Sequence, residues 1–456
     1  MSLTDSSAAE IAKTASMASR LLATLPGAAR NDALSALHEA IANSRVEILE
    51  ANSRDVAAAE RAVEAGVLNG SVLKRLDLSR PGKFEDMLQG ILSVKDLDDP
   101  VGIVTMRTLL DDDLTLEKVS CPIGVLLIIF EARPEVIANI AALSIKSGNA
   151  AILKGGKEST ESFITISKVI SKAIASTRVP KGSIQLVETR EAVSSLLAQD
   201  SHIDLVIPRG SKELVRFVQD NTKIPVLGHA DGLCSAYIHA DADLDMAVQV
   251  IVDSKTNYPA ACNSLETLLV HEDVLQTVFP AVAEALFAKG VALRCDPPSK
   301  EALASRVVDA QRSLISEAVA CDYKTEFLDL VLAVKTIPSD NQSEKSLDAA
   351  IVHINNHSSK HTDIIITKSA SAAEHFMNSV DSAGVFWNAS TRFADGMRYG
   401  FGTEVGISTN KIHSRGPVGL DGLTIYKYKI RGQGQKAGDY SETGCGKRYK
   451  HKALPL

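Results

Sequence analysis

The chain has 456 residues, of which 45% are apolar, and this size and composition predict two or three globular domains with well-filled cores. Its 49 Lys and Arg against 56 Asp and Glu give a formal net charge of −7, which excludes a general basic field for binding nucleic acid or acidic lipid. The longest apolar run, residues 123–130, is far shorter than the about 20 residues of a bilayer helix, so we expect no membrane span. The sequence does not open with a basic segment followed by an apolar one, so we expect a cytoplasmic protein.

The first third of the chain predicts helices followed by a hairpin. Residues 6–64 are rich in alanine with charges every few positions, a pattern that predicts two or three amphipathic helices. In residues 101–119, two apolar and β-branched runs flank an acidic turn at residues 111–113. This pattern predicts a β-hairpin.

From residue 123 onward, short apolar strands alternate with amphipathic helices, which predicts an α/β fold with a doubly wound parallel sheet. A nucleotide-type crevice at one edge of the sheet follows from that topology. The strands are expected at residues 123–130, 150–156, 183–188 and 203–208, and the helices near 134–146, 159–175, 191–198 and from 211.

The remainder of the chain predicts a second α/β domain. A helix at residues 244–253 precedes strands near 330–337, 363–367 and 384–389. The segment after Gly432 is rich in glycine and ends in a mildly basic stretch, so we expect a poorly ordered tail.

Cys262 is the cysteine whose setting suggests chemistry. It lies between a predicted helix and a predicted strand, with small Ala260 and Ala261 before it and polar Asn263 and Ser264 after it. Such a loop can expose a thiolate among hydrogen-bond donors, as a covalent acyl intermediate requires. A loop cysteine is more often inert, so the motif alone leaves both interpretations open. The six cysteines include no pair at CxxC spacing, so they predict neither a disulfide scaffold nor a thiolate zinc site.

Two groups of residues are candidates for binding phosphate. Gly210 and Ser211 follow a predicted strand and open a helix, where free N–H groups can face a pyrophosphate or simply cap the helix. Lys154, Gly155 and Lys157 end another strand at the same expected edge of the sheet. A solvated loop is the alternative for this second group.

His353, His357 and His361 are spaced by four residues, which on one continuous helix would present three imidazoles to a metal. The intervening Asn and Ser pairs compete with helical hydrogen bonds, and a strand follows at residues 363–367. We therefore expect a polar loop and no metal site.

Several motifs in the same order resemble the aldehyde dehydrogenase superfamily, and within it the branch that reduces L-glutamyl 5-phosphate. The resemblance runs to about Gly432, essentially the whole globular chain. The motifs are EARPEV at 131–136, ILKGGKE at 152–158, YPAACNSLET at 258–267, AIVHINNHSSKHTDII at 350–365, STRFADG at 390–396 and FGTEVGIST at 401–409.

The resemblance implies a three-part aldehyde dehydrogenase-like subunit. It has a Rossmann-type NADP-binding domain at residues 1–100 and 120–232, and an α/β catalytic domain at 233–410 that carries Cys262. A small β element for oligomerisation, at residues 101–119 and 411–432, precedes the tail at 433–456. The implied assembly is a homodimer or homotetramer.

The implied activity is NADPH-dependent reduction of L-glutamyl 5-phosphate to glutamate 5-semialdehyde and phosphate in proline biosynthesis, through a thioester on Cys262. The resemblance leaves open whether glutamate 5-kinase hands over the unstable acyl phosphate.

Three departures from the aldehyde-oxidising relatives are informative. His229 stands where those relatives have the glutamate that activates water, and Arg133 stands where they have an oxyanion-hole asparagine. A cation there suits an acyl phosphate with a dianionic leaving group. Lys157 stands where NAD-preferring relatives carry a glutamate on the ribose, which favours the 2′-phosphate of NADPH.

The resemblance assigns the remaining site residues. The Cys262 backbone N–H and either Arg133 or Asn263 would hold the oxyanion. Glu326 resembles the glutamate that binds the nicotinamide ribose. Lys255, Arg133 and Arg392 are candidates for the substrate phosphate and α-carboxylate. Two other interpretations remain open: an NAD-dependent aldehyde oxidiser of the same fold, and a non-enzymatic metal-binding protein built on the three histidines.

Overall fold

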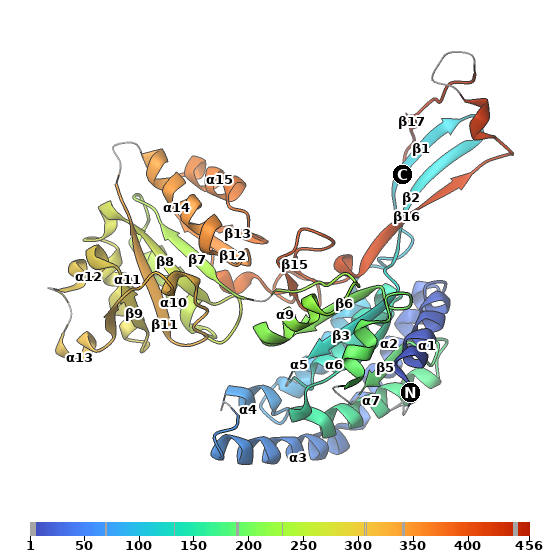
Figure 1. Cartoon of the computed structure of the whole chain (residues 1–456), viewed down its shortest axis with the longest axis horizontal. Coiled ribbons are helices and arrows are strands. Elements are labelled where there is room, and N and C mark those ends of the chain that lie inside the picture. The colour runs from blue at the N-terminus through green and yellow to red at the C-terminus, as the bar shows by residue number, and fades with distance from the viewer. Residues whose placement is uncertain are drawn as a thin grey trace. The chain divides into compact units, whose positions relative to one another are not determined.

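The computed structural model divides into two compact units (Figure 1). Unit 1 comprises Met1–Leu227, Gly400–Gly406 and Val418–Leu456, and unit 2 comprises Gly228–Tyr399 and Ile407–Pro417. The structure describes residues 6–68, 71–131, 133–187, 191–229, 231–304, 306, 308–339, 343–440 and 446–456.

The centre of unit 1 is a four-stranded parallel sheet in the order β5-β4-β3-β6. Every residue of the central strand β3 is buried, which explains its unbroken apolar sequence. The chain steps outward from β3 to β5 and then returns to the other side of β3 for β6, so the order reverses between β3 and β6. The strands are β3 (Val125–Phe130), β4 (Ala150–Lys154), β5 (Ile184–Val187) and β6 (Leu205–Arg209).

Helices cover both faces of this sheet, as the alternating sequence predicted. Residues of α1, α8 and α9 share a core with one face, and residues of α2, α5, α6 and α7 share a core with the other. The helices are α1 (Ala8–Leu22), α2 (Gly27–Asn43), α3 (Arg45–Glu64), α4 (Ser71–Leu76), α5 (Lys83–Asp96), α6 (Val136–Ser147), α7 (Thr160–Ala175), α8 (Glu191–Leu197) and α9 (Lys212–Asp220), with 3₁₀ turns η1 (Lys157–Ser159), η5 (Asp421–Leu423) and η6 (Ala437–Asp439).

The predicted hairpin forms part of a four-stranded antiparallel sheet in the order β16-β2-β1-β17, which we call the β element. The expectation of a poorly ordered tail is wrong for its last residues. Thr108 and Leu109 pair with Ala453 and Lys452, because the free edge of β1 offers unpaired backbone groups. The strands are β1 (Val104–Asp111), β2 (Leu114–Pro122), β16 (Thr424–Arg431) and β17 (Lys452–Ala453).

Unit 2 contains a seven-stranded parallel sheet in the order β10-β9-β11-β8-β7-β12-β13. Residues of α10, α11 and α12 share a core with one face, and residues of α14 and α15 share a core with the other. The strands are β7 (Cys234–Ile238), β8 (Leu265–His271), β9 (Ala292–Cys295), β10 (Ile315–Glu317), β11 (Val331–Ile337), β12 (Thr362–Ile366) and β13 (Gly384–Trp387).

The same unit holds a two-stranded sheet that corrects the predicted boundary of the β element. Residues 411–417 belong to unit 2, because Ile407 and Ser408 pair with Pro417 and Gly416, whereas residues 400–406 belong to unit 1. The remaining elements are α10 (Leu244–Thr256), α11 (Phe279–Phe287), α12 (Pro297–Ala304), α13 (Asp309–Arg312), α14 (Ser343–His357), α15 (Ala370–Ser379), β14 (Ile407–Ser408), β15 (Gly416–Pro417), η2 (Glu272–Val274), η3 (Asp322–Lys324) and η4 (Thr391–Phe393).

The expected polar loop at the three histidines is wrong for two of them. Helix α14 continues to His357, so His353 and His357 are helical, and their rings stack with centroids 4.1 Å apart. The helix ends there and His361 lies four residues beyond it, so the three rings do not share one helical face.

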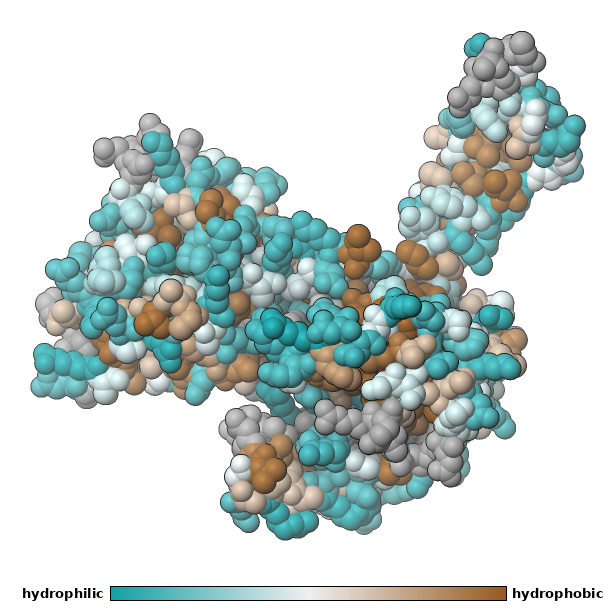
Figure 2. All heavy atoms as spheres, in the orientation of Figure 1, coloured by the Kyte–Doolittle hydropathy of each residue, from teal (hydrophilic) through white to brown (hydrophobic). Residues whose placement is uncertain are grey.

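Figure 2 shows hydrophilic side chains over most of the visible face of each unit, and a group of apolar side chains on the β element. Ile425 and Ile430 of β16 are 39% and 61% exposed. Among the described residues, no helix is long and apolar enough to cross a membrane.

Candidate active site

Cys262 lies in the loop that joins α10 to β8. Two backbone hydrogen bonds close the loop, from Ala261 to the Tyr258 carbonyl at 3.1 Å and from Ser264 to the Ala261 carbonyl at 2.9 Å. The buried Ser264 hydroxyl donates toward the Ser254 carbonyl at 3.4 Å and so ties the loop to the last turn of α10. The Cys262 side chain is partly buried.

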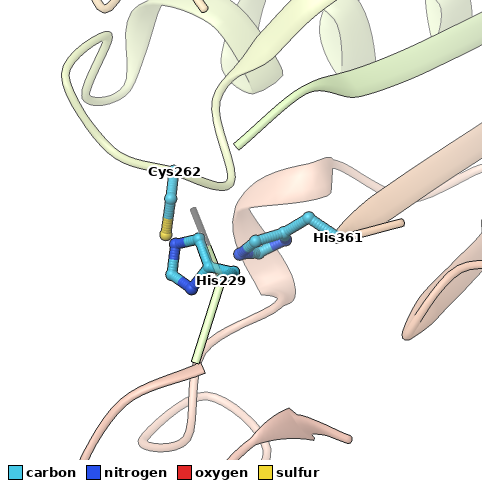
Figure 3. A group of neighbouring side chains, drawn as sticks. All are labelled: His229, Cys262 and His361. Atoms are coloured by element: carbon cyan, nitrogen blue, oxygen red, sulfur yellow. The ribbon is translucent and has the colours of Figure 1, made fainter. Parts of the chain in front are cut away.

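Two histidines converge on this thiol (Figure 3). Sγ of Cys262 and one ring nitrogen each of His229 and His361 lie within 4.8 Å of one another. The centroids of the two imidazole rings are 5.2 Å apart, and the ring planes are nearly perpendicular. His229, Cys262 and His361 precede β7, β8 and β12, which are neighbours in the order β8-β7-β12. The amino ends of three adjacent parallel strands therefore bring the three residues together.

The outer nitrogen of each histidine is already engaged. Nδ1 of His229 lies 2.9 Å from the Ile407 carbonyl oxygen, which can only accept, so Nδ1 carries the hydrogen and Nε2 is left for the thiol. Nδ1 of His361 lies 2.9 Å from Oγ1 of Thr362, and its Nε2 is buried without a hydrogen-bond partner. In Figure 3 the ring of His361 points toward His229 and Cys262.

The imidazoles change the acidity of the thiol. Burial alone would raise the pKa of Cys262, but the neighbouring imidazoles of His361 and His229 outweigh it and hold the pKa well below its usual range. Burial would lower the pKa of His229, but the Cys262 thiolate raises it to about 9. Around neutral pH the group is therefore a thiolate beside a cationic imidazole, the activated form of a cysteine nucleophile.

Buried hydrogen bonds of Asp363 fix the start of β12, next to His361. The carboxylate of Asp363, two residues later, accepts from the hydroxyls of Ser358 and Ser382 and from the Ser235 backbone at 2.5–2.8 Å. Burial raises the pKa of Asp363 to about 6, against the opposing effect of these hydrogen bonds. The turn before His361 is thus anchored to β7.

Gly232 and Glu326 lie directly against the Cys262 loop. A Cβ at Gly232 would lie 2.3 Å from the Cys262 carbonyl oxygen and 2.6 Å from Oε1 of Glu326, so only glycine fits. Burial and then the Cys262 thiolate raise the pKa of Glu326. Glu326, expected at the nicotinamide ribose, therefore lies beside the backbone of Cys262.

The expected substrate role of Lys255 does not fit this structure. Its side chain is 0% exposed, and Nζ lies 2.8 Å from Oε2 of Glu266 in a buried ion pair. Burial lowers the pKa of Lys255 and raises that of Glu266 to about 7. Glu266 also accepts from the Leu328 backbone at 3.3 Å. Lys255 therefore ties the end of α10 to the start of β8 and is not available to an anionic ligand.

Asn263 is committed to a structural contact, and Arg392 remains a candidate for anion binding. Nδ2 of the buried Asn263 donates to the Ala394 carbonyl at 2.9 Å, which does not favour it as the oxyanion donor. Arg392 lies in η4 and is partly buried, with Arg398 nearby. Burial and then Arg398 lower the pKa of Arg392, whereas the Cys262 thiolate raises it.

The other predicted residues lie in unit 1, after the carboxyl ends of its parallel strands. Lys154, Gly155 and Lys157 follow or end β4, and a Cβ at Gly155 would lie 1.8 Å from the Phe163 ring. Arg133 follows β3, and Gly210 and Ser211 follow β6. These positions lie at the edge where open α/β sheets bind ligands.

In this structure the Gly210–Ser211 turn already holds an anion. The Ser211 backbone N–H donates to Oε2 of Glu131 at 3.0 Å, and the Ser211 hydroxyl accepts from Leu214 as the N-cap of α9. A Cβ at Gly210 would lie 2.5 Å from the same carboxylate oxygen. The predicted pyrophosphate donor is therefore also a helix cap, and its N–H binds a carboxylate.

Sequence reasoning missed His361 as a partner of Cys262 and missed the buried Glu266. One available signal was that His229, Cys262 and His361 each come shortly before a short apolar run, at residues 234–238, 265–270 and 362–366. Residues at the same ends of neighbouring parallel strands share one edge of the sheet.

Comparison with known proteins agrees with this fold. The family model described as "Aldehyde dehydrogenase family" matches residues 2–304. A "Probable gamma-glutamyl phosphate reductase" of Schizosaccharomyces pombe is 55% identical over 98% of this chain and 97% of its own. A "Gamma-glutamyl phosphate reductase" of Saccharomyces cerevisiae is 51% identical over 99% of each chain. The crystal structure of gamma-glutamyl phosphate reductase from Thermotoga maritima is similar with a TM-score of 0.86 and 36% identity, covering 94% of this chain and 100% of that one.

Proposed function

The chain belongs to the aldehyde dehydrogenase family, and on that premise we propose that it reduces L-glutamyl 5-phosphate with NADPH to glutamate 5-semialdehyde and phosphate, a step of proline biosynthesis. The family binds a nicotinamide cofactor, and the choice of NADPH is part of the proposal.

The observation that carries the proposal is the state of Cys262. Its thiol faces ring nitrogens of His229 and His361 within 4.8 Å, and its pKa lies well below the usual range, so the thiolate exists at neutral pH. A thiolate attacks an activated acyl group without needing a base at the moment of reaction. An acyl phosphate is such an activated acyl group, because its phosphate leaves as a stable anion.

In the proposed reaction, Sγ of Cys262 bonds to the carbonyl carbon and the carbon–oxygen bond to phosphate breaks, leaving a glutamyl thioester. NADPH supplies the hydride that reduces the thioester carbon. The carbon–sulfur bond of the resulting thiohemiacetal then breaks, which releases the aldehyde and regenerates the thiolate. The Cys262 backbone N–H is the expected first donor to the oxyanion, with Arg133 as the candidate for the second.

The residues of unit 1 suit a dinucleotide phosphate. Ser211 offers an N–H at the start of α9, and its contact with Glu131 shows that this N–H binds an anionic oxygen. A pyrophosphate would take the place of that carboxylate. Lys154 and the exposed Lys157 lie at the end of the neighbouring strand β4, where Lys157 is proposed to contact the 2′-phosphate.

Arg392 is the proposed ligand of the substrate's anionic groups. Of the cations expected there from the sequence, Arg392 lies in unit 2 with Cys262 and is only partly buried, whereas Lys255 is held in a buried ion pair. A guanidinium can bind a phosphate or carboxylate through two parallel hydrogen bonds.

The β element supports the proposed self-association. Strand β16 lies at an edge of its sheet, and Ile425, Tyr426, Tyr428 and Ile430 on its two faces are 39–61% exposed. An open edge with apolar side chains on both faces is a surface that soluble proteins usually cover. Light scattering is expected to give a dimer or tetramer, and a monomer at micromolar concentration would contradict this assignment.

The assay that tests the proposed function runs in reverse, with glutamate 5-semialdehyde and NADP+ in the presence and absence of phosphate. We expect activity that requires phosphate or arsenate, because His229 replaces the glutamate that activates water in aldehyde oxidisers. Cys262→Ala should reduce the rate by several orders of magnitude, whereas Cys321→Ala, which removes an exposed thiol of the same unit, should not.

Either of two results would contradict the proposal. More than about a tenth of the wild-type activity in Cys262→Ala would exclude a covalent nucleophile at this residue. Fast production of glutamate without phosphate would identify an aldehyde-oxidising dehydrogenase instead.

A further inference from the structure

We propose that Cys262, His229 and His361 form a reversible binding site for a soft divalent cation, Zn²⁺ above all, and that the bound ion blocks the nucleophile. The proposed Zn²⁺ site does not depend on which reaction the enzyme catalyses, whereas the proposed inhibition rests on the proposed function.

The donor set is one that zinc prefers. A thiolate and two imidazole nitrogens lie within 4.8 Å of one another, and sites with three protein ligands leave a fourth position for water. Tetrahedral zinc with Zn–S and Zn–N bonds of about 2.3 and 2.0 Å brings its ligand atoms to about 3.5 Å apart. Closing the group from 4.8 Å needs displacements of about 1 Å or less, within the range of side-chain rotation.

An unpartnered nitrogen points into the group. His361 is 1% exposed, and its Nε2 is buried without a hydrogen-bond partner. A buried polar atom without a hydrogen-bond partner is uncommon in proteins, and a bound ligand or ion can supply the missing partner. Figure 3 shows this ring directed toward His229 and Cys262, so an ion between the three side chains would satisfy the atom.

The outer contacts match those of metal-binding histidines. A ligating imidazole usually donates its second N–H to a carbonyl or other acceptor, which fixes the ring and leaves a lone pair on the ligating nitrogen. Nδ1 of His229 donates to the Ile407 carbonyl at 2.9 Å, and Nδ1 of His361 lies 2.9 Å from the Thr362 hydroxyl. The carbonyl contact therefore directs Nε2 of His229 toward the ion, and the hydroxyl contact fixes the orientation of the His361 ring.

The same geometry predicts competition between metal and substrate. A sulfur that coordinates Zn²⁺ has its lone pair engaged and cannot attack a carbonyl carbon, so the loaded protein should be inactive. Removal of the ion by a chelator restores the thiolate. By contrast, His353 and His357 stack on α14, and within the described chain no third His, Cys, Asp or Glu joins them as a metal-ligand group.

The test uses the full chain freed of metal, titrated with Zn²⁺ against a chromophoric zinc indicator. We expect one tight site per chain, and loss of affinity by tenfold or more in His361→Gln and in Cys262→Ala. The matched control is His375→Gln, which removes an exposed imidazole of the same unit and should leave the affinity unchanged. Activity of the wild-type chain should fall in proportion to the bound zinc and return with chelator.

Measurements on the wild-type chain keep the test independent of whether a variant folds. Co²⁺ in place of Zn²⁺ should give a thiolate-to-cobalt charge-transfer band, and Zn²⁺ should protect Cys262 from iodoacetamide. Lack of stoichiometric binding, or binding without the charge-transfer band, would overturn the site. Zinc bound at Cys262 with full activity would overturn the inhibition, and the phosphate-dependence assay would still stand by itself.

Discussion

Replacing His229 by glutamine should raise the pKa of the Cys262 thiol. The amide keeps the size and polarity of the side chain but removes a cation that faces Sγ within 4.8 Å. An opposite charge at about 4–6 Å lowers a pKa by about 1–3 units, so its loss should raise the thiol pKa by that amount. Burial of Cys262 also raises the pKa of its thiol, and less remains to oppose this effect once the cation is removed.

The pH dependence of inactivation by iodoacetamide measures this change. The wild-type rate should reach its plateau well below the usual thiol pKa of about 8.5, and the His229→Gln midpoint should move upward by about 1–3 pH units. The plateau rate should rise at the same time, because a more basic thiolate is the better nucleophile. With a Brønsted coefficient of about 0.4–0.5, a shift of two units corresponds to an about 6- to 10-fold faster plateau.

The two readouts separate electrostatics from damage to the fold. A disturbed loop that shields the thiol would lower the plateau, whereas loss of the cation alone raises it. His375→Gln is the control, since this exposed imidazole pairs with Asp348 in the same unit. An unchanged midpoint in His229→Gln would refute the assignment of a thiolate–imidazolium pair.

Three further substitutions test the surroundings of the site and the cofactor choice. Gly232→Ala should cost about 1–3 kcal/mol in urea unfolding, because its Cβ would lie within 2.3–2.6 Å of neighbouring atoms, whereas Gly438→Ala, with nothing within 4 Å, should be neutral. Lys255→Met should destabilise the chain by about 3–5 kcal/mol by leaving the Glu266 carboxylate buried alone, and adding Glu266→Gln should recover much of that loss in the same unfolding assay. Lys157→Glu should erase or invert an about 10- to 150-fold preference for NADPH over NADH, mainly through KM, and an unchanged ratio of the two kcat/KM values would remove Lys157 from the 2′-phosphate.

The sequence predicted most elements of unit 1 and some of those of unit 2, because local patterns determine them. The apolar runs at 123–130 and 363–367 predict buried strands, and the alanine-rich N-terminus predicts amphipathic helices. Neither prediction needs information from distant parts of the chain. The hairpin at 101–119 was equally visible, since its acidic turn separates two strand-like runs.

Contacts between distant segments were not predictable in this way. Lys255 and Glu266 are an ordinary pair of charges in the sequence, and only the packing of α10 against β8 shows that both are buried. The pairing of Lys452 with Leu109 joins segments more than three hundred residues apart. His361 meets Cys262 because β12 and β8 flank β7, an order that strand patterns alone do not reveal.

Mass spectrometry of the acyl-enzyme tests the central claim most directly. The chain is mixed with glutamate 5-semialdehyde and NADP+ without phosphate, digested, and examined for a glutamyl adduct. The thioester mechanism predicts one adduct per chain on the peptide that carries Cys262, discharged within a turnover when phosphate is added. An adduct on another residue, or steady NADPH formation with no adduct on Cys262, would contradict it.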